Sequence, residues 1–305
     1  MPFDKVGQTA RSPSFSQAAC LQAVYRRVRE ALVRARGSLS TRKRRSADAC
    51  RLFEMQAFGE VIDALTRQFD SGVIISRHSS GPVVYGLDPP SRRFIVELDG
   101  IDNFLRGLPM ATISIAMGSP DTTLSLQAAE TSLVGLLDED CSWYAVRGHG
   151  AWHRGRRLRA PVTKSTGGAF VSWRRTQGLE TLLDDEGVAE LRDFGCTVAP
   201  IAMIASGSLD AHIDLSGDVP RECVLAVAHI LHEAGGALWV SPGVALAELE
   251  PLPARVCLLA FASRQLANAA SRVLARDDDV VAAANGPHDS GPCGAVRPAG
   301  MVIAR

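Results

Sequence analysis

The chain has 305 residues, and its formal net charge at pH 7 is zero because 33 basic residues balance 33 acidic ones. This balance argues against a protein whose main task is to bind nucleic acid, and the length suits one large domain with a substantial core. The sequence contains no apolar signal segment near its start and no run of 18 apolar residues, so we expect neither secretion nor a membrane span.

Helical patterns dominate the first part of the chain. Residues 1–15 lack a regular apolar pattern and are expected to form a flexible tail. Residues 16–37 carry apolar side chains at helical spacing, and so do residues 47–69, which predicts two amphipathic helices. The basic loop between them, residues 41–45, is interpreted as a solvated loop, although a phosphate site would use the same residue types.

Short apolar runs separated by polar turns follow, which is typical of strands. Strands are expected over residues 73–75, 94–96, 111–117, 133–137, 142–147, 169–173, 212–215, 238–240 and 256–261. Further helices are expected over residues 179–191, 198–207, 223–234 and 263–276. Residues 277–305 are rich in Gly, Pro, Ala and Asp, and we expect a disordered tail there. This mixture of elements predicts an α/β (α+β) fold.

The most informative stretch is residues 94–104, in which an apolar run is followed by Glu97, Asp99 and Gly100. The apolar run predicts a buried strand, and the residues after Gly100 can begin a helix. Carboxylates at the end of a strand, followed by a glycine turn and a helix, suit metal or phosphate chemistry.

This stretch resembles a motif of the inositol monophosphatase family, Asp-Pro-Ile-Asp-Gly-Thr followed by Asn-Phe and a Gly-x-Pro turn. Further landmarks of that family recur in the same order, including Gly148–Ala151, Gly195, Gly207 with Asp210 and Ala211, and Glu233–Gly236. The resemblance covers residues 16–276, which we take as one domain. It implies a five-layer αβαβα sandwich of the inositol monophosphatase / fructose-bisphosphatase type and a homodimer.

The chain departs from the family pattern where the resemblance places the metal ligands. Family enzymes bind Mg²⁺ through one Glu and three Asp residues, and these positions correspond here to His78, Val96, Asp99 and Cys223. Ile101 stands where a Thr helps to activate water. An imidazole, an aliphatic side chain and a thiol are poor ligands for Mg²⁺, so we predict no Mg²⁺ cofactor and no Mg²⁺-dependent phosphatase activity.

Other residues of the expected pocket could compensate for these losses or add to them. Glu97 is adjacent to Val96, so on a strand it should face the opposite side and miss the site. Asp102 either competes with phosphate for the N–H groups of the following helix or is the N-cap of that helix. The expected pocket residues are Glu97, Gly100, Ile101, Asp102, Asn103 and Asp210.

Three chemically active side chains would then converge in a repurposed pocket. A helix N-terminus lowers the pKa of a thiol, so Cys223 could be a nucleophile, with His78 as base and Asp99 as the residue that orients it. This predicts a metal-independent acyl-transfer or cyclisation enzyme of specialised metabolism, acting on a small-molecule or carrier-bound substrate. The same three side chains could instead bind Zn²⁺.

Two further functions stay open. One is an active Mg²⁺-dependent phosphomonoesterase that uses Asp99, Glu97 and shifted ligands. The other is a non-catalytic binding or scaffold protein.

The remaining cysteines and histidines are expected to have no part in the site. Seven scattered cysteines without a CxxC pair indicate reduced thiols in a cytoplasmic protein. His149 and His153 are expected at the surface, and His229 and His232 on the outer face of the 223–234 helix, away from its apolar stripe.

Overall fold

A computed structural model describes residues 13–42, 44, 46–86, 88–120, 126, 128–162, 168–174, 190–241 and 255–268. Most of the expected N-terminal tail, the whole C-terminal tail and most of the helix expected over residues 179–191 lie outside these ranges. Residues 190–192, at the end of that expected helix, form a strand, so the prediction is wrong there.

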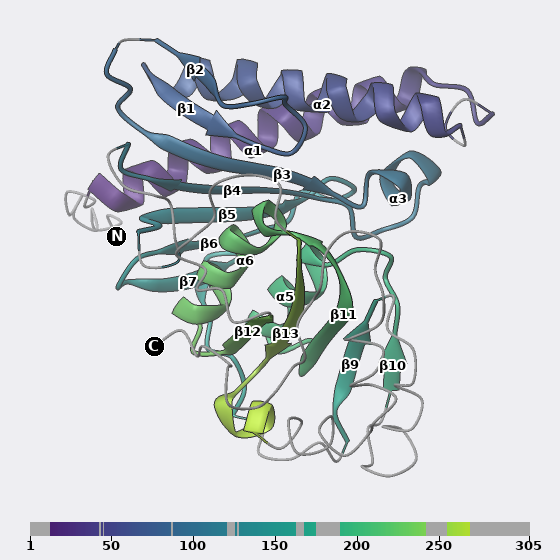
Figure 1. The fold of residues 1–305 in the computed structure, drawn as a ribbon, viewed down its shortest axis with the longest axis vertical. Helices are drawn as coiled ribbons and strands as arrows, with labels where there is room; N and C mark the ends of the chain where they lie inside the picture. Colours follow the sequence, from purple (N-terminus) through teal and green to yellow (C-terminus); the bar gives the residue numbers. More distant parts are fainter. Residues whose placement is uncertain are drawn as a thin grey trace, which may run out of the picture.

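Two long helices, α1 (Pro13–Ser38) and α2 (Ala47–Gln68), lie side by side on one face of the first sheet (Figure 1). The side chain of Ser46 caps α2 by accepting a hydrogen bond from the backbone N–H of Ala49. The buried side chains of α2 recur every three or four residues, as expected for a helix that covers a sheet. Both helices therefore form where the apolar spacing predicted them.

The first sheet has eight strands in the order β2-β1-β3-β4-β5-β6-β7-β8. Every neighbouring pair is antiparallel except β1 and β3, which are parallel. The strands are β1 (Gly72–Ile75), β2 (Val83–Tyr85), β3 (Arg93–Asp99), β4 (Thr112–Gly118), β5 (Thr131–Leu136), β6 (Ser142–Val146), β7 (Gly150–His153) and β8 (Arg156–Arg157). Strands β4 and β5 are buried along their whole length because helices cover both faces of the sheet.

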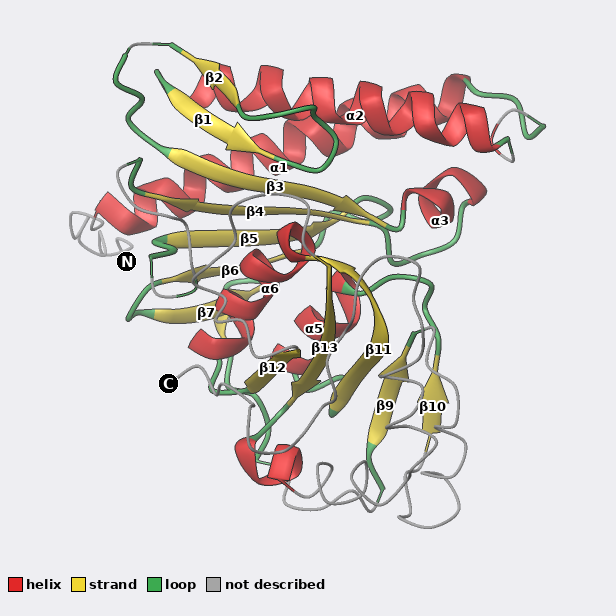
Figure 2. Ribbon diagram, viewed as in Figure 1, coloured by secondary structure: helices red, strands yellow, loops and turns green. Residues whose placement is uncertain are grey.

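The second sheet has five strands in the order β10-β9-β11-β13-β12. The strands are β9 (Phe170–Trp173), β10 (Glu190–Arg192), β11 (Ala211–Pro220), β12 (Ala237–Ser241) and β13 (Arg255–Phe261). Helices α5 (Val198–Ala205) and α6 (Arg221–Glu233) fill the space between the two sheets (Figure 2). A third short helix, α3 (Ile101–Arg106), follows β3 directly.

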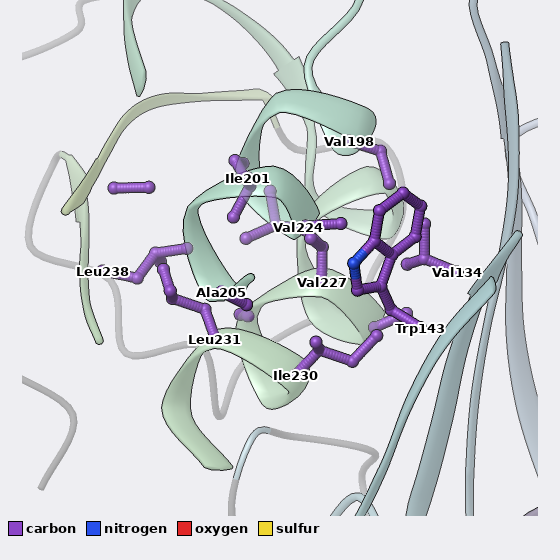
Figure 3. Close-up of a cluster of buried hydrophobic side chains, with 14 of the residues drawn as sticks. Val134, Trp143, Val198, Ile201, Ala205, Val224, Val227, Ile230, Leu231 and Leu238 are labelled. Atoms are coloured by element: carbon purple, nitrogen blue, oxygen red, sulfur yellow. The ribbon is translucent and has the colours of Figure 1, made fainter. Parts of the chain in front are cut away.

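A buried apolar cluster joins α5 and α6 to both sheets. Figure 3 shows Trp143 of the first sheet packed beside Val198 of α5 and Val227 of α6, with Leu238 of the second sheet nearby. On the other face of the second sheet, Leu266 and the rest of helical residues 264–268 join a separate cluster. The layers are therefore helix, sheet, helix, sheet and helix, which confirms the expected αβαβα sandwich.

The position of α6 between two sheets changes the surroundings of its histidines. His232 is exposed as expected, but His229 is only 1% exposed, so its predicted place on an outer face was wrong. Nδ1 of His229 lies 2.9 Å from the hydroxyl of Ser132 on β5. Burial lowers the pKa of His229 to about 3, so this residue is neutral in the folded protein. No helix in the described part of the chain is long and apolar enough to cross a membrane.

Candidate functional site

The register of β3 decides which acids face the interior of the sandwich. Val96 and Leu98 belong to the cluster beneath α1 and α2, whereas Ile95 packs toward α5 and α6. Because side chains alternate along a strand, Glu97 and Asp99 share the face of Ile95. The expectation that Glu97 points away from the site was therefore wrong, and Val96 is the residue that points away.

Glu97 is fully buried and forms the centre of a polar cluster. Its Oε1 atom accepts a hydrogen bond from Nε of Arg77 at 2.5 Å and lies 3.0 Å from Nε2 of His78. The side chain of Arg77 is 39% exposed and that of His78 is 5% exposed. Arg77 also donates to the carbonyl oxygen of Leu98. The loop after β1 thus covers the Glu97 carboxylate with an arginine and a histidine.

The first turn of α6 brings two more side chains to this cluster. Cys223 is 4% exposed, and burial raises the pKa of its thiol well above the usual value, with added repulsion from the charges of Glu97 and Asp99. The pKa was expected to be lowered by the helix N-terminus, but desolvation is the larger effect here. Cys223 as a reactive nucleophile stays a prediction, without support from its surroundings.

Glu222, the neighbour of Cys223, was not among the expected pocket residues. It is 2% exposed, and neither carboxylate oxygen has a hydrogen-bond partner among the described residues. Burial raises the pKa of Glu222, and the charge of Glu97 raises it further. Only its place next to Cys223 at the start of a helix could have identified it in the sequence.

Asp99 faces the interior but is occupied by a different element. Its Oδ2 atom accepts hydrogen bonds from the backbone N–H groups of Thr197 at 2.7 Å and Val198 at 2.9 Å, where α5 begins. Its Oδ1 atom lies 3.6 Å from a guanidinium nitrogen of Arg174. The carboxylate therefore binds the positive end of a helix, a favourable place for an anion. Glu97, and not Asp99 as expected, is the acid beside His78.

The glycine turn after β3 forms as the motif predicts. Gly100 has φ of 74°, and a Cβ atom there would lie 2.9 Å from the carbonyl oxygen of Met110, so only glycine is tolerated without strain. Gly100 is also the N-cap of α3, which corrects the expectation that Asp102 caps this helix. Asp102 is exposed and hydrogen-bonds to Cys50 on α2, and burial together with this bond raises the pKa of Cys50 to about 12.

Three other expected pocket residues have structural contacts. Ile101 is buried in the cluster beneath α1 and α2, so it does not line the polar site. Asn103 donates from Nδ2 to the carbonyl oxygen of Phe194 at 2.8 Å. Asp210 accepts a hydrogen bond from the backbone N–H of Phe170 at 3.0 Å, which joins the start of β11 to β9.

The residues at this site do not fit a magnesium centre. Mg²⁺ requires several hard oxygen ligands in octahedral geometry. In the described part of the chain, no group of three or more His, Cys, Asp or Glu side chains could hold a metal ion, and this includes the set His78, Asp99 and Cys223 considered for Zn²⁺. Arg77 adds a positive charge directly beside Glu97. A divalent cation would have to displace this guanidinium.

Comparisons with known proteins agree with the fold. The sequence model of the inositol monophosphatase family matches residues 14–270. The fructose-1,6-bisphosphatase/inositol-1-monophosphatase of Methanothermobacter thermautotrophicus is 25% identical over 187 residues, which are 59% of this chain and 66% of that protein. The Nus factor SuhB of Escherichia coli is 26% identical over 186 residues, 58% of this chain and 66% of that protein. The chain thus spans just under two thirds of the length of these relatives.

Solved structures resemble nearly the whole of the described fold. The extragenic suppressor protein SuhB from Bartonella henselae has a TM-score of 0.68 at 20% identity and covers 85% of this chain and 99% of its own. The IMPase of Thermotoga maritima has a TM-score of 0.62 at 17% identity and covers 88% and 97%. At these identities the structural likeness shows the fold alone, whereas the family match extends over most of the sequence. The chain belongs to the inositol monophosphatase family.

Proposed function

We propose that this member of the family has lost the Mg²⁺-dependent phosphatase reaction and works through a repurposed polar site. The observation that carries the proposal is the pairing of Glu97, a fully buried acid, with Arg77 and His78. A carboxylate already neutralised by a guanidinium is a weak ligand for a divalent cation, because binding would leave the arginine without its partner.

The other positions support the same conclusion. Asp99 accepts two backbone hydrogen bonds from the start of α5 and would have to give them up to bind a metal ion. Val96 points toward α1 and α2, and Cys223 offers a soft, buried sulfur. Each carboxylate or replaced ligand at this site therefore already has a role in which a magnesium ion takes no part.

The substrate or ligand of the repurposed site is proposed to be a small or carrier-bound molecule. A metal-independent acyl-transfer or cyclisation reaction is the catalytic form of this proposal, with Cys223 as nucleophile and His78 as base. Within that scheme Glu97 replaces Asp99 as the residue that orients His78, since Glu97 lies 3.0 Å from its Nε2 atom. Zn²⁺ has no part in the scheme.

The release of inorganic phosphate tests the loss of activity. Inositol 1-phosphate and fructose 1,6-bisphosphate are suitable substrates because the archaeal relative is named for both reactions, and a chromogenic phosphate monoester extends the range. We expect equal release from the wild-type protein and an Asp99→Asn variant, in MgCl₂ as in EDTA. Mg²⁺-dependent release that the Asp99→Asn variant lacks would refute the proposal.

An active phosphatase with shifted ligands is the second candidate, and Glu222 favours it. Both oxygens of this buried carboxylate, together with Oε2 of Glu97, have no partner among the described residues. Oxygens of this kind are suitable ligands for Mg²⁺. If this candidate is correct, the wild-type protein releases phosphate in MgCl₂ and a Glu222→Gln variant does not.

A non-catalytic role is the third form of the proposal. Curated relatives of this chain are named as phosphatases and as a Nus factor, so family membership does not choose between catalysis and binding. We also propose a cytoplasmic homodimer. The six described cysteines are free, which supports a reducing compartment, and light scattering after gel filtration measures the oligomeric state.

A further inference from the structure

The polar cluster around Glu97 contains more acid than base. The pKa of Glu222 is raised by the charge of Glu97, and the pKa of Cys223 responds to Glu97, Asp99 and Glu222, so these groups lie within electrostatic reach of one another. Arg77 is the arginine that contacts Glu97 directly. The guanidinium therefore has the place of a counterion for more than one carboxylate.

The buried oxygens around it are poised to accept a cation. Oε2 of Glu97 and both oxygens of Glu222 are buried without hydrogen-bond partners among the described residues. Glu97 is fully buried and Glu222 is 2% exposed. Buried carboxylates of this kind are costly unless a positive charge compensates them. They are also the hard oxygen donors that Mg²⁺ and Mn²⁺ prefer.

Arg77 reaches the cluster from outside. It lies in the turn after β1, and 39% of its side chain is exposed, whereas the acid it contacts has no exposure. Truncation of this side chain would leave Glu97 and Glu222 without their guanidinium neighbour. It would also open a path from solvent to their unpartnered oxygens.

We infer that the guanidinium of Arg77 takes the electrostatic place of a divalent cation in this protein, and that its removal converts the cluster into a site that requires one. The inference rests on the proposed function, since a wild-type site that holds Mg²⁺ would need no such substitute. The expected ligand of the altered site is a small divalent cation with a preference for oxygen donors.

Thermal unfolding of the full chain tests the inference, with a readout that does not depend on activity. The wild-type protein, Arg77→Ala and the double variant Arg77→Ala/Glu97→Gln are each measured in EDTA, MgCl₂ and MnCl₂. Arg27→Ala is the matched control, because Arg27 pairs with Asp63 at the surface, where both side chains are largely exposed.

We expect the same Tm for the wild-type protein and for Arg27→Ala in all three solutions. Arg77→Ala should have a lower Tm in EDTA and should recover by at least about 2 °C in MnCl₂. The double variant should lose this recovery. A folded Arg77→Ala protein that does not respond to Mn²⁺ would overturn the inference and leave the proposed function intact, whereas a rise in the wild-type Tm would overturn the proposed function itself.

A variant that fails to fold is also informative. If Arg77→Ala is unfolded in EDTA and folded in MnCl₂, the inference is supported. If it is unfolded in both, Arg77→Gln preserves most of the side-chain volume while removing the charge, and Mn²⁺ titration followed by electron paramagnetic resonance decides. Saturable binding to Arg77→Gln and none to the wild-type protein is the expected result, and its absence would contradict the inference.

Discussion

The ion pair between Arg77 and Glu97 should respond unequally to the loss of each partner. Removal of one member of a buried pair costs about 3–5 kcal/mol when the other charge is left buried and unpaired. Glu97 has no exposure, so Arg77→Met leaves its carboxylate with only His78 as a neighbour, and we expect a loss near 3 kcal/mol at the lower end of that range.

The reverse change should cost less. In Glu97→Gln the amide oxygen can still accept a hydrogen bond, and the guanidinium, whose side chain is 39% exposed, can turn toward water. We therefore expect a loss of about 1–2 kcal/mol. The double variant Arg77→Met/Glu97→Gln should be about as stable as Glu97→Gln alone, because the second change no longer leaves a buried charge unpaired.

Urea unfolding of the four proteins in one buffer measures these differences and their coupling. The exposed pair Arg27–Asp63 provides a matched cycle, for which we expect a coupling free energy below about 1 kcal/mol. An equal cost for the two single variants at the site, or a coupling no larger than in the control cycle, would refute the claim that Arg77 compensates a buried acid.

Three further predictions follow from the buried polar groups. Because burial raises the pKa of the Cys223 thiol, iodoacetamide at pH 7 should label it more slowly than the partly exposed Cys20, and faster labelling that depends on His78 would instead support the nucleophile. The pKa of His229 is about 3 in the folded protein and about 6.5 in an unfolded chain, so below pH 6.5 only the unfolded state takes up its proton. Stability should therefore fall by up to about 1.4 kcal/mol per pH unit from this residue, and a His229→Gln variant that kept the same slope between pH 7 and 4.5 would contradict this. Tyr25→Phe leaves the buried N–H of Cys141 without its acceptor and should cost about 1–3 kcal/mol in urea unfolding, whereas no loss would show that water replaces the hydroxyl.

The fold could be predicted from the sequence because its landmarks are turns that only certain residues can form. Gly100 adopts a left-handed conformation directly after β3, and the glycines at the end of α6 are likewise followed by β12. Such residues fix the order and spacing of the elements independently of the side chains at the site. The two N-terminal helices were equally clear from the spacing of their apolar side chains.

The face of each residue on β3 could not be predicted. This strand is buried on both sides, so apolar residues occur at odd and even positions and no alternation is visible. Val96 was assigned to the site by its place in the motif, whereas packing puts it beneath α1 and α2 and leaves Glu97 at the centre. The sequence identified Arg77 and His78 as replacements for acids but could not show which acid they contact.

The surroundings of α6 were also beyond the sequence. A helix between two sheets has no outer polar face, so the usual inference from an apolar stripe fails for His229 and for Glu222. Burial of these groups is a property of the tertiary arrangement, and with it come the shifted pKa values of His229, Glu222 and Cys223.

Direct titration of the wild-type protein with Mn²⁺, followed by electron paramagnetic resonance, tests the central claim that this site has exchanged its metal for internal charges. The account predicts no saturable binding, and no difference between the wild-type protein and Asp99→Asn. Saturable binding that is weakened by Asp99→Asn or Glu222→Gln would contradict it.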